Sequence, residues 1–388
     1  MKSLKKAMAL MVACASIFGT VANAAFLNPI DSSPTMKQLA DSSASFKGAG
    51  GYFAAYYAGP DSETNNPVKI TYDEAADAMK WDVFGYNYAW IFQNGNQYDR
   101  GYDERRSSFG KIKMTASFSF DALAKDAEGN NITGKGQNLN AGYIYAASAY
   151  VKDGTTTYGN TAGLNLETKF AGQHFNWGNS RLDLYGKTVK HNFPGCSYGD
   201  KLTLTFEADC VADTASVVLY NETKDTVVSS LAVTEKDNID IICVKDGLYS
   251  RFRSLWDMTW YEFSSVREQF IAKDASVATA AGKVTGTINV ANNAEHNVTA
   301  IQNPAATVEM ALYDAEDRMV DCGVSESTAL PVRMASGSND TEMIQSPPTY
   351  VPITAEVNAT DYAYAKFFVW DGTDTMKPFT EVARVNAN

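Results

Sequence analysis

The sequence predicts an all-β protein made of two successive sandwiches, a large jelly roll followed by a smaller sandwich. Short runs in which apolar or aromatic residues alternate with polar ones recur along the chain, and this period of two is typical of β-strands. Turns rich in Gly, Asn and Asp separate the runs at close intervals, as they do in sandwiches and jelly rolls. Amphipathic helical patterns are scarce, with one short candidate at residues 72–80.

The first 24 residues have the pattern of a secretory signal peptide. A basic start precedes an apolar stretch over residues 7–18, and Ala22-Asn23-Ala24 supplies the small residues of a cleavage site. We therefore expect an exported protein that works outside the cell or on the cell surface. Cys14 offers a lipoprotein alternative, although the residues before it match that signal poorly. Because no second long apolar run follows, we expect no membrane-spanning segment.

The net charge of the chain limits the classes of partner that it can bind. It has 33 Lys and Arg residues against 45 Asp and Glu residues, a formal net charge of −12. Removal of the lysine-bearing signal peptide makes the mature protein more acidic still. An acidic surface repels phosphates and anionic lipid headgroups, so we expect no nucleic-acid partner. The same acidity keeps an exported protein soluble.

Residues 25–51 are mostly small and polar, and we interpret them as a leader ahead of a large domain over residues 52–270. Clean alternation over residues 84–92 predicts a strand with one aromatic side. That side carries Tyr86, Tyr88, Trp90 and Phe92, which we expect mainly in the core. Further strands are expected at residues 113–120, 141–151, 163–170, 180–185, 202–206, 216–220, 226–233, 239–244 and 258–263.

Several of these runs carry a resemblance to a known fold. They are Gly163-Leu164-Asn165-Leu166 and the stretches 201–206, 216–221 and 256–263. Together they resemble the concanavalin-A-like sandwich of lectins, laminin-G modules and many polysaccharide-active proteins. The resemblance implies such a sandwich over residues 52–270. It names no activity, because families with unrelated functions share these features.

The C-terminal part carries a more specific pattern. Lys366-Phe367 and Trp370-Asp371 are followed by Met376-Lys377-Pro378, and Ala311-Leu312-Tyr313-Asp314 precedes a turn earlier in the chain. This sequence pattern resembles the immunoglobulin-like module that ends many bacterial secreted and surface proteins. The resemblance implies a second, immunoglobulin-like sandwich over residues 275–388, a scaffold that accompanies many activities.

Four cysteines remain after the signal peptide. Cys196 and Cys210 lie beyond opposite ends of an expected strand that spans about 20 Å, too far for a bridge, whose Cα atoms lie within about 7 Å. We therefore predict a disulfide between Cys210 and Cys243 and a free thiol at Cys322. Reduced thiols throughout are the alternative if the host lives without oxygen.

No catalytic or metal-binding motif is found. The paired carboxylates of a glycosidase strand are missing, and Gln173 and His174 are adjacent, so they point to opposite faces of a strand and do not make a lyase site. The three histidines lie far apart and argue against zinc. We expect no cofactor, with structural calcium left open. Its candidate ligands are Asp237, Asn238 and Asp240, or Asp99 and Asp103.

Aromatic residues in loops are the better functional lead. Exposed rings stack on the apolar face of a sugar while amides bond to its hydroxyls. The stretch around Trp177 has a loop-like sequence, and we predict a ligand-binding surface there. Its residues are Phe175, Asn176, Trp177, Tyr98 and Tyr102. Trp256, Trp260 and Trp370 fall in expected strands and are predicted to lie in the core.

These observations favour a secreted or cell-surface protein that binds extracellular carbohydrate without catalysis. Its partner would be an extracellular glycan or another cell-surface component. The competing function is structural, a surface-layer or filament subunit that self-associates through edge strands. A polysaccharide lyase or hydrolase is the third alternative.

Overall fold

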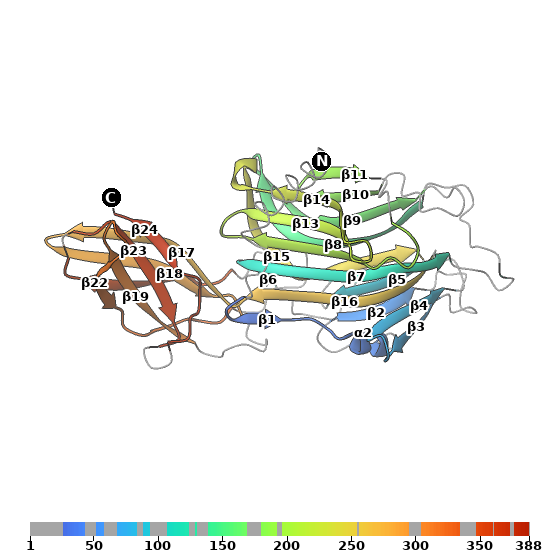
Figure 1. Ribbon diagram of the computed structural model, residues 1–388, viewed down its shortest axis with the longest axis horizontal. Helices are drawn as coiled ribbons and strands as arrows, with labels where there is room; N and C mark the ends of the chain where they lie inside the picture. The colour runs from blue at the N-terminus through green and yellow to red at the C-terminus, as the bar shows by residue number, and fades with distance from the viewer. Residues whose placement is uncertain are drawn as a thin grey trace, which may run out of the picture.

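The computed structural model describes residues 26–42, 52–57, 68–83, 88–93, 107–123, 129, 139–168, 180–191, 196–253, 256–294, 304–333, 347–359, 361–372 and 376–387. It shows an all-β protein with two sandwiches in tandem, as the sequence predicts, the smaller one following the larger along the long axis of the molecule (Figure 1). No helix among these residues is long and apolar enough to cross a membrane.

The larger sandwich packs two antiparallel sheets against each other. The first sheet has the order β14 (Thr226–Val233), β13 (Thr214–Asn221), β12 (Leu202–Asp209), β7 (Lys111–Leu123), β16 (Trp256–Glu268), β4 (Ala78–Val83) and β3 (Val68–Asp73), with β1 (Pro29–Asp31) on β16. The second has the order β11 (Lys187–His191), β10 (Ser180–Leu184), β9 (Thr155–Thr168), β8 (Leu139–Lys152), β15 (Ile239–Arg253), β5 (Tyr88–Gln93) and β2 (Tyr52–Tyr57), with β6 (Ser107–Ser108) on β15.

Strand alternation builds the core between these sheets. Leu202, Leu204 and Phe206 on β12 are buried, and the residues between them are partly exposed. Aromatic rings from both sheets meet in the middle, and their tilted and edge-on contacts suit the ring quadrupoles. These rings belong to Trp81, Phe118, Phe120, Phe252, Trp256 and Trp260. Trp256 and Trp260 are buried as expected, while Trp370 keeps partial exposure.

Residues 72–80 form a β-hairpin and not the expected helix, with the turn at residues 74–77. Strands β3 and β4 pair on either side of it, and Met79 and Trp81 point into the core with strand periodicity. The Asp73 carboxylate accepts hydrogen bonds from the amides of Ala75 and Ala76, and Asp77 takes a positive φ of 46°. Pairing of β3 with β4 outweighs the helix propensity of the Ala-rich run, because propensity alone contributes little beside tertiary contacts.

Residues 26–42 belong to the sandwich, although their composition suggested a leader. β1 pairs with β16, and α2 (Met36–Ser42) packs Met36 and Leu39 into the core. Thr35 and Gln38 cap this helix reciprocally, since each side chain accepts the backbone amide of the other.

The smaller sandwich has a three-stranded and a five-stranded sheet. The first has the order β17 (Phe270–Ala280), β18 (Lys283–Asn292) and β22 (Val351–Val357); the second has the order β20 (Met319–Val324), β19 (Ala305–Tyr313), β23 (Tyr364–Trp370) and β24 (Ala383–Asn386), with β21 (Thr328–Ala329) on β19. Gly286 lets the layers approach, because a Cβ there would lie 2.8 Å from the Phe367 ring. The immunoglobulin-like identity of this module remains a prediction.

A buried ionic network joins the two sandwiches. Arg267 on β16 pairs with Asp246 on β15 at 3.2 Å, and both side chains are fully buried. Ser32, next to β1, donates to the same carboxylate at 2.6 Å. The Arg267 guanidinium also donates to the Asn293 carbonyl in the smaller sandwich at 2.7 Å. One ion pair therefore ties the N-terminal segment, both sheets of the larger sandwich and the second sandwich together.

Replacing Asp246 by Asn should lower the free energy of unfolding by about 3–5 kcal/mol, because it strands a buried guanidinium without its counter-charge. The matched control is Glu356→Gln in the exposed Lys283–Glu356 pair, which should cost less than about 1 kcal/mol. Urea denaturation of both variants measures the difference. Equal midpoints for the two variants would show that the buried pair has no such role.

Candidate functional site

The five residues predicted to bind ligand lie outside the described residues. Tyr98 and Tyr102 belong to the connection between β5 and β6, and the stretch Phe175, Asn176 and Trp177 to the connection between β9 and β10. All four strands belong to the second sheet of the larger sandwich. The predicted segments therefore connect strands of this one sheet, whose outer face carries a group of described side chains.

Two rows of side chains cross this outer face. Ile144, Leu164 and Leu182 point into the core, so their neighbours along each strand point outward. The pairing register aligns one row from β15 to β11, with Tyr249, Tyr145, Gly163, Asp183 and Thr188. The next row runs from β8 to β11, with Tyr143, Asn165, Arg181 and Lys190. We call these nine residues the tyrosine face.

Asp183 organises the polar part of the tyrosine face. Its Oδ2 accepts the Tyr145 hydroxyl at 2.7 Å and Arg181 Nε at 2.9 Å, and its Oδ1 accepts the Thr188 hydroxyl at 2.7 Å. Gly163 lies between Tyr145 and Asp183 in the first row and leaves room for their hydrogen bond, because a Cβ there would lie 2.9 Å from the Tyr145 ring. Three donors thus fix one carboxylate in a single orientation.

The three tyrosines form a connected aromatic group beside that carboxylate. The Tyr143 ring centroid lies 5.3 Å from that of Tyr145 and 5.4 Å from that of Tyr249. Tyr145 and Tyr249 are nearly buried, whereas Tyr143 is partly exposed. Burial and the Asp183 carboxylate raise the pKa of Tyr145, so its hydroxyl stays protonated and donates at physiological pH.

Two groups on this face have capacity left for a ligand. The Asn165 side chain is buried, and its Oδ1 has no hydrogen-bond partner among the described residues. Arg181 is partly exposed, and Asp183 raises the pKa of its guanidinium. The face therefore exposes a charged donor at Arg181 and the partly exposed ring of Tyr143, while Asn165 Oδ1 is an unpaired acceptor buried beneath the surface.

Sequence reasoning missed this face. The alternation over residues 141–151 places Tyr143 and Tyr145 on one side of a strand, and this was the available signal. Their neighbours Asp183 and Arg181 come from a later strand, and Asp183 follows Tyr145 by 38 residues in the sequence. Only the pairing register brings them together, and register depends on the whole sheet.

The disulfide predicted between Cys210 and Cys243 does not form, and the possible calcium ligands are not gathered into a site in the described residues. The Asp237 carboxylate pairs with Lys187 Nζ at 2.6 Å and accepts a hydrogen bond from the Thr234 amide. Asp99 and Asp103 lie outside the described residues. The described part of the chain holds no group of three or more His, Cys, Asp or Glu residues able to hold a metal. Cys210 and Cys243 are free thiols. Burial raises the pKa of both, that of Cys243 to about 12, so little of the reactive thiolate forms at neutral pH.

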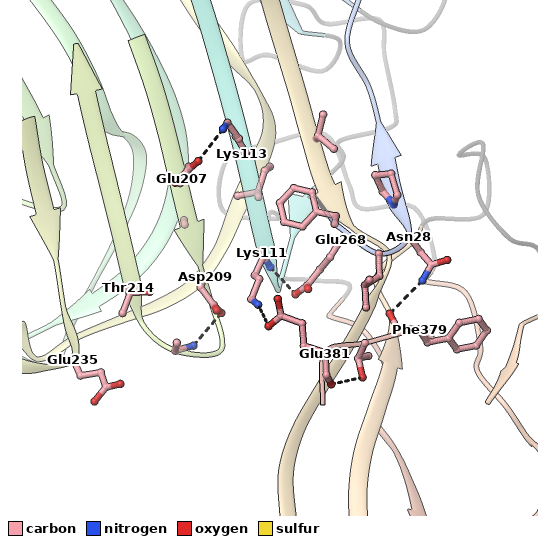
Figure 2. Close-up of a pocket in the computed structure, with 18 residues that line it drawn as sticks. Asn28, Lys111, Lys113, Glu207, Asp209, Thr214, Glu235, Glu268, Phe379 and Glu381 are labelled. Carbon is pink, nitrogen blue, oxygen red and sulfur yellow. Dashed lines mark hydrogen bonds and ion pairs between the residues drawn. The ribbon is translucent and has the colours of Figure 1, made fainter. Parts of the chain in front are cut away.

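A pocket of about 580 Å³ lies where the two sandwiches meet (Figure 2). The Glu268 carboxylate accepts the Lys111 amide at 2.7 Å, and Lys111 Nζ pairs with Glu381 from the smaller sandwich at 2.6 Å. Asn28 Nδ2 donates to the Pro378 carbonyl at 2.8 Å. Burial, with smaller contributions from the charges of Asp209 and Glu381, raises the pKa of Glu268 to about 7. Because these groups pair across the boundary, the pocket is a joint between the sandwiches.

Comparison with known proteins gives no family for this chain. No family model matches, and no curated protein matches. Among solved structures, the chain is similar to legume lectins: peanut lectin (12% identity, TM-score 0.28, 55% of this chain and 97% of that one), lectin I-B4 from Griffonia simplicifolia (9%, 0.30, 56% and 99%) and the seed lectin of Lotus tetragonolobus (10%, 0.30, 57% and 95%). At these TM-scores the similarity to the lectins supports no conclusion about this chain. The fold is therefore described by the strand order and register of this protein itself.

The Glu268→Gln variant should change how stability depends on pH. The folded state raises the pKa of Glu268 from 4.5 to about 7, so the folded protein holds this proton more tightly than the unfolded chain does. Its contribution is present in full below about pH 4.5 and is lost as pH rises through about 7. The variant should therefore gain stability over wild type as pH rises across this window, by up to about 3 kcal/mol.

Urea titrations at several pH values measure this difference. Glu356→Gln, which changes an exposed carboxylate, should keep the wild-type pH dependence. A Glu268→Gln curve parallel to wild type throughout would mean that Glu268 ionises normally in the folded protein.

Proposed function

We propose that the protein binds extracellular carbohydrate without catalysis and that the tyrosine face is the binding surface. The observation that carries this proposal is the cluster of Tyr143, Tyr145 and Tyr249 on one face of a sheet, beside an Asp183 carboxylate that holds both Tyr145 and Arg181. The signal-peptide pattern of residues 1–24 supports an extracellular or cell-surface location.

The chemistry of the face suits a sugar. Tyrosine rings offer apolar area for the carbon face of a pyranose and lose little side-chain entropy when it binds. The Arg181 guanidinium can donate to ring hydroxyls or to a carboxylate, and Asn165 Oδ1 can accept from a hydroxyl. Because Asp183 already holds Tyr145 and Arg181 in place, binding needs little reorganisation of the protein.

The same geometry argues for binding rather than hydrolysis. A glycosidase places two carboxyl groups across the scissile bond, about 5–5.5 Å apart when it retains configuration and about 6.5–9.5 Å apart when it inverts. In the described part of the tyrosine face, Asp183 is the carboxylate, and both its oxygens accept hydrogen bonds from neighbouring side chains. A second carboxylate facing it is not among these nine residues.

A structural role in surface assembly is the second candidate function. It is favoured by one observation, the exposed apolar edge strand β20.

Replacing Tyr143 by Ala or Arg181 by Ala should weaken glycan binding at least tenfold, corresponding to about 1.4 kcal/mol. The loss should follow from removal of a stacking ring or of a charged donor. A glycan array identifies a ligand, and calorimetry with that ligand measures the affinity of each variant.

Tyr261→Ala is the matched control, because Tyr261 is a partly exposed tyrosine on the first sheet; it should leave affinity unchanged. Trp177→Ala, in the connection from β9 to β10, tests whether the binding surface extends to the segment predicted from sequence. Binding that survives both Tyr143→Ala and Arg181→Ala would rule out this face, and sugar release from a polysaccharide panel would favour an enzyme.

A further inference from the structure

The second row of the tyrosine face ends in two cations. Arg181 on β10 and Lys190 on β11 are directly paired in the antiparallel register, so their side chains leave the sheet on the same side with Cβ atoms about 5 Å apart. Like charges directly opposite each other destabilise a sheet, and a bound anion would relieve this repulsion. The register of β15 with β8 places a third cationic residue, Arg251, next to Tyr143 on the other side of the row.

Asp183 balances only part of this positive charge. Its two oxygens already accept hydrogen bonds from Arg181 Nε and from the hydroxyls of Tyr145 and Thr188. Lys190 is exposed and forms no ion pair within the part of the chain that the structure describes. Arg181 and Lys190 together therefore carry one positive charge more than the Asp183 carboxylate neutralises.

The Arg181 guanidinium has donors left for a ligand. Its side chain is 36% exposed, and Nε is the nitrogen that bonds to Asp183 at 2.9 Å. The Tyr145 hydroxyl is a further neighbour of the guanidinium. The terminal nitrogens present additional N–H groups in a planar fork, which matches the two oxygens of a carboxylate. A carboxylate on the ligand therefore fits between Arg181 and Lys190.

The distance between the aromatic and the cationic part of the row sets the size of the ligand. Tyr143 on β8 and Lys190 on β11 are three strands apart, roughly 14 Å at about 4.8 Å per strand. This span exceeds one pyranose ring, so a single sugar cannot stack on Tyr143 and also reach both cations. An oligosaccharide that lies across the strands can place one ring on Tyr143 and the carboxylate of another sugar between Arg181 and Lys190.

The negative net charge of the chain and the cations of this row act over different distances. Salt screens the formal net charge of −12 beyond about 8 Å at physiological ionic strength. A carboxylate between Arg181 and Lys190 lies well within that distance of both cations. The net charge therefore slows the approach of an acidic glycan, while the two cations hold it once it is bound.

We propose that the tyrosine face binds an acidic oligosaccharide, with the carboxylate of a uronic acid between Arg181 and Lys190 and another sugar ring on Tyr143. This inference rests on the proposed function and narrows its ligand from carbohydrate in general to sugars that carry a carboxylate. Charge-assisted hydrogen bonds are about twice as strong as neutral ones. The two cations therefore supply the selectivity for acidic sugars, and the Tyr143 ring supplies affinity for acidic and neutral sugars alike.

Matched pairs of oligosaccharides test this proposal. Hexasaccharides of galacturonate, glucuronate and mannuronate are each compared with their carboxyl-reduced counterparts by calorimetry on the full chain. At least one uronate should bind, and reduction of its carboxylates to alcohols should weaken binding at least about tenfold. Binding of a neutral oligosaccharide through Tyr143 without preference for the uronate form would overturn this inference and leave the proposed function standing. Absence of binding to any glycan would contradict both.

Variants separate the cations from the ring. Lys190→Gln should weaken binding of the uronate at least about fivefold and leave its reduced counterpart unaffected, because only a charge-assisted contact is lost. Tyr143→Ala should weaken binding of both forms by similar factors. The matched control is Lys69→Gln, at an exposed lysine on β3 of the first sheet, which should change neither. Unchanged uronate affinity in Lys190→Gln, equal losses for both sugars, or tighter binding of a sulfated oligosaccharide than of the uronate would each overturn the carboxylate assignment.

Discussion

The Arg267–Asp246 pair is the constraint on which the rest of this molecule depends. Two opposite charges with no exposure to water are stable only as a pair with further hydrogen bonds around them. Those bonds come from the segment beside β1, from β6 and from the smaller sandwich. Only Gln269 separates β16 in the larger sandwich from β17 in the smaller one. The joint between the sandwiches is therefore held by this network and by the stacked rings of Phe270 and Phe379, whose centroids lie 3.9 Å apart.

A rigid sheet supports the binding role that we propose for the tyrosine face. β15 and β16 carry the two halves of the buried pair, and β15 also carries Tyr249 beside Tyr145 of β8. Asp246 lies where the β8–β15 register shifts, between Val244 and Leu248, and Tyr249 follows directly after this irregularity. Because side chains on packed strands keep their rotamers, recognition by this face requires little ordering of the protein when ligand binds.

The sequence predicts what depends on local pattern. Alternation correctly places the strands around Phe118, Leu204 and Trp260 and their buried sides. It fails where tertiary contacts decide: residues 72–80 have helical composition but pair as a hairpin, and residues 26–42 look polar but bury Met36 and Leu39. The tyrosine face needed register, because Tyr145 meets Asp183 only across the glycine of a third strand.

The most direct test is an NMR titration of tyrosine-labelled protein with a glycan that it binds. If the tyrosine face recognises sugar, the ring resonances of Tyr143, Tyr145 and Tyr249 shift together with saturation, and those of Tyr261 and Tyr364 stay in place. Shifts confined to tyrosines elsewhere, with these three unmoved at saturation, would contradict the proposal.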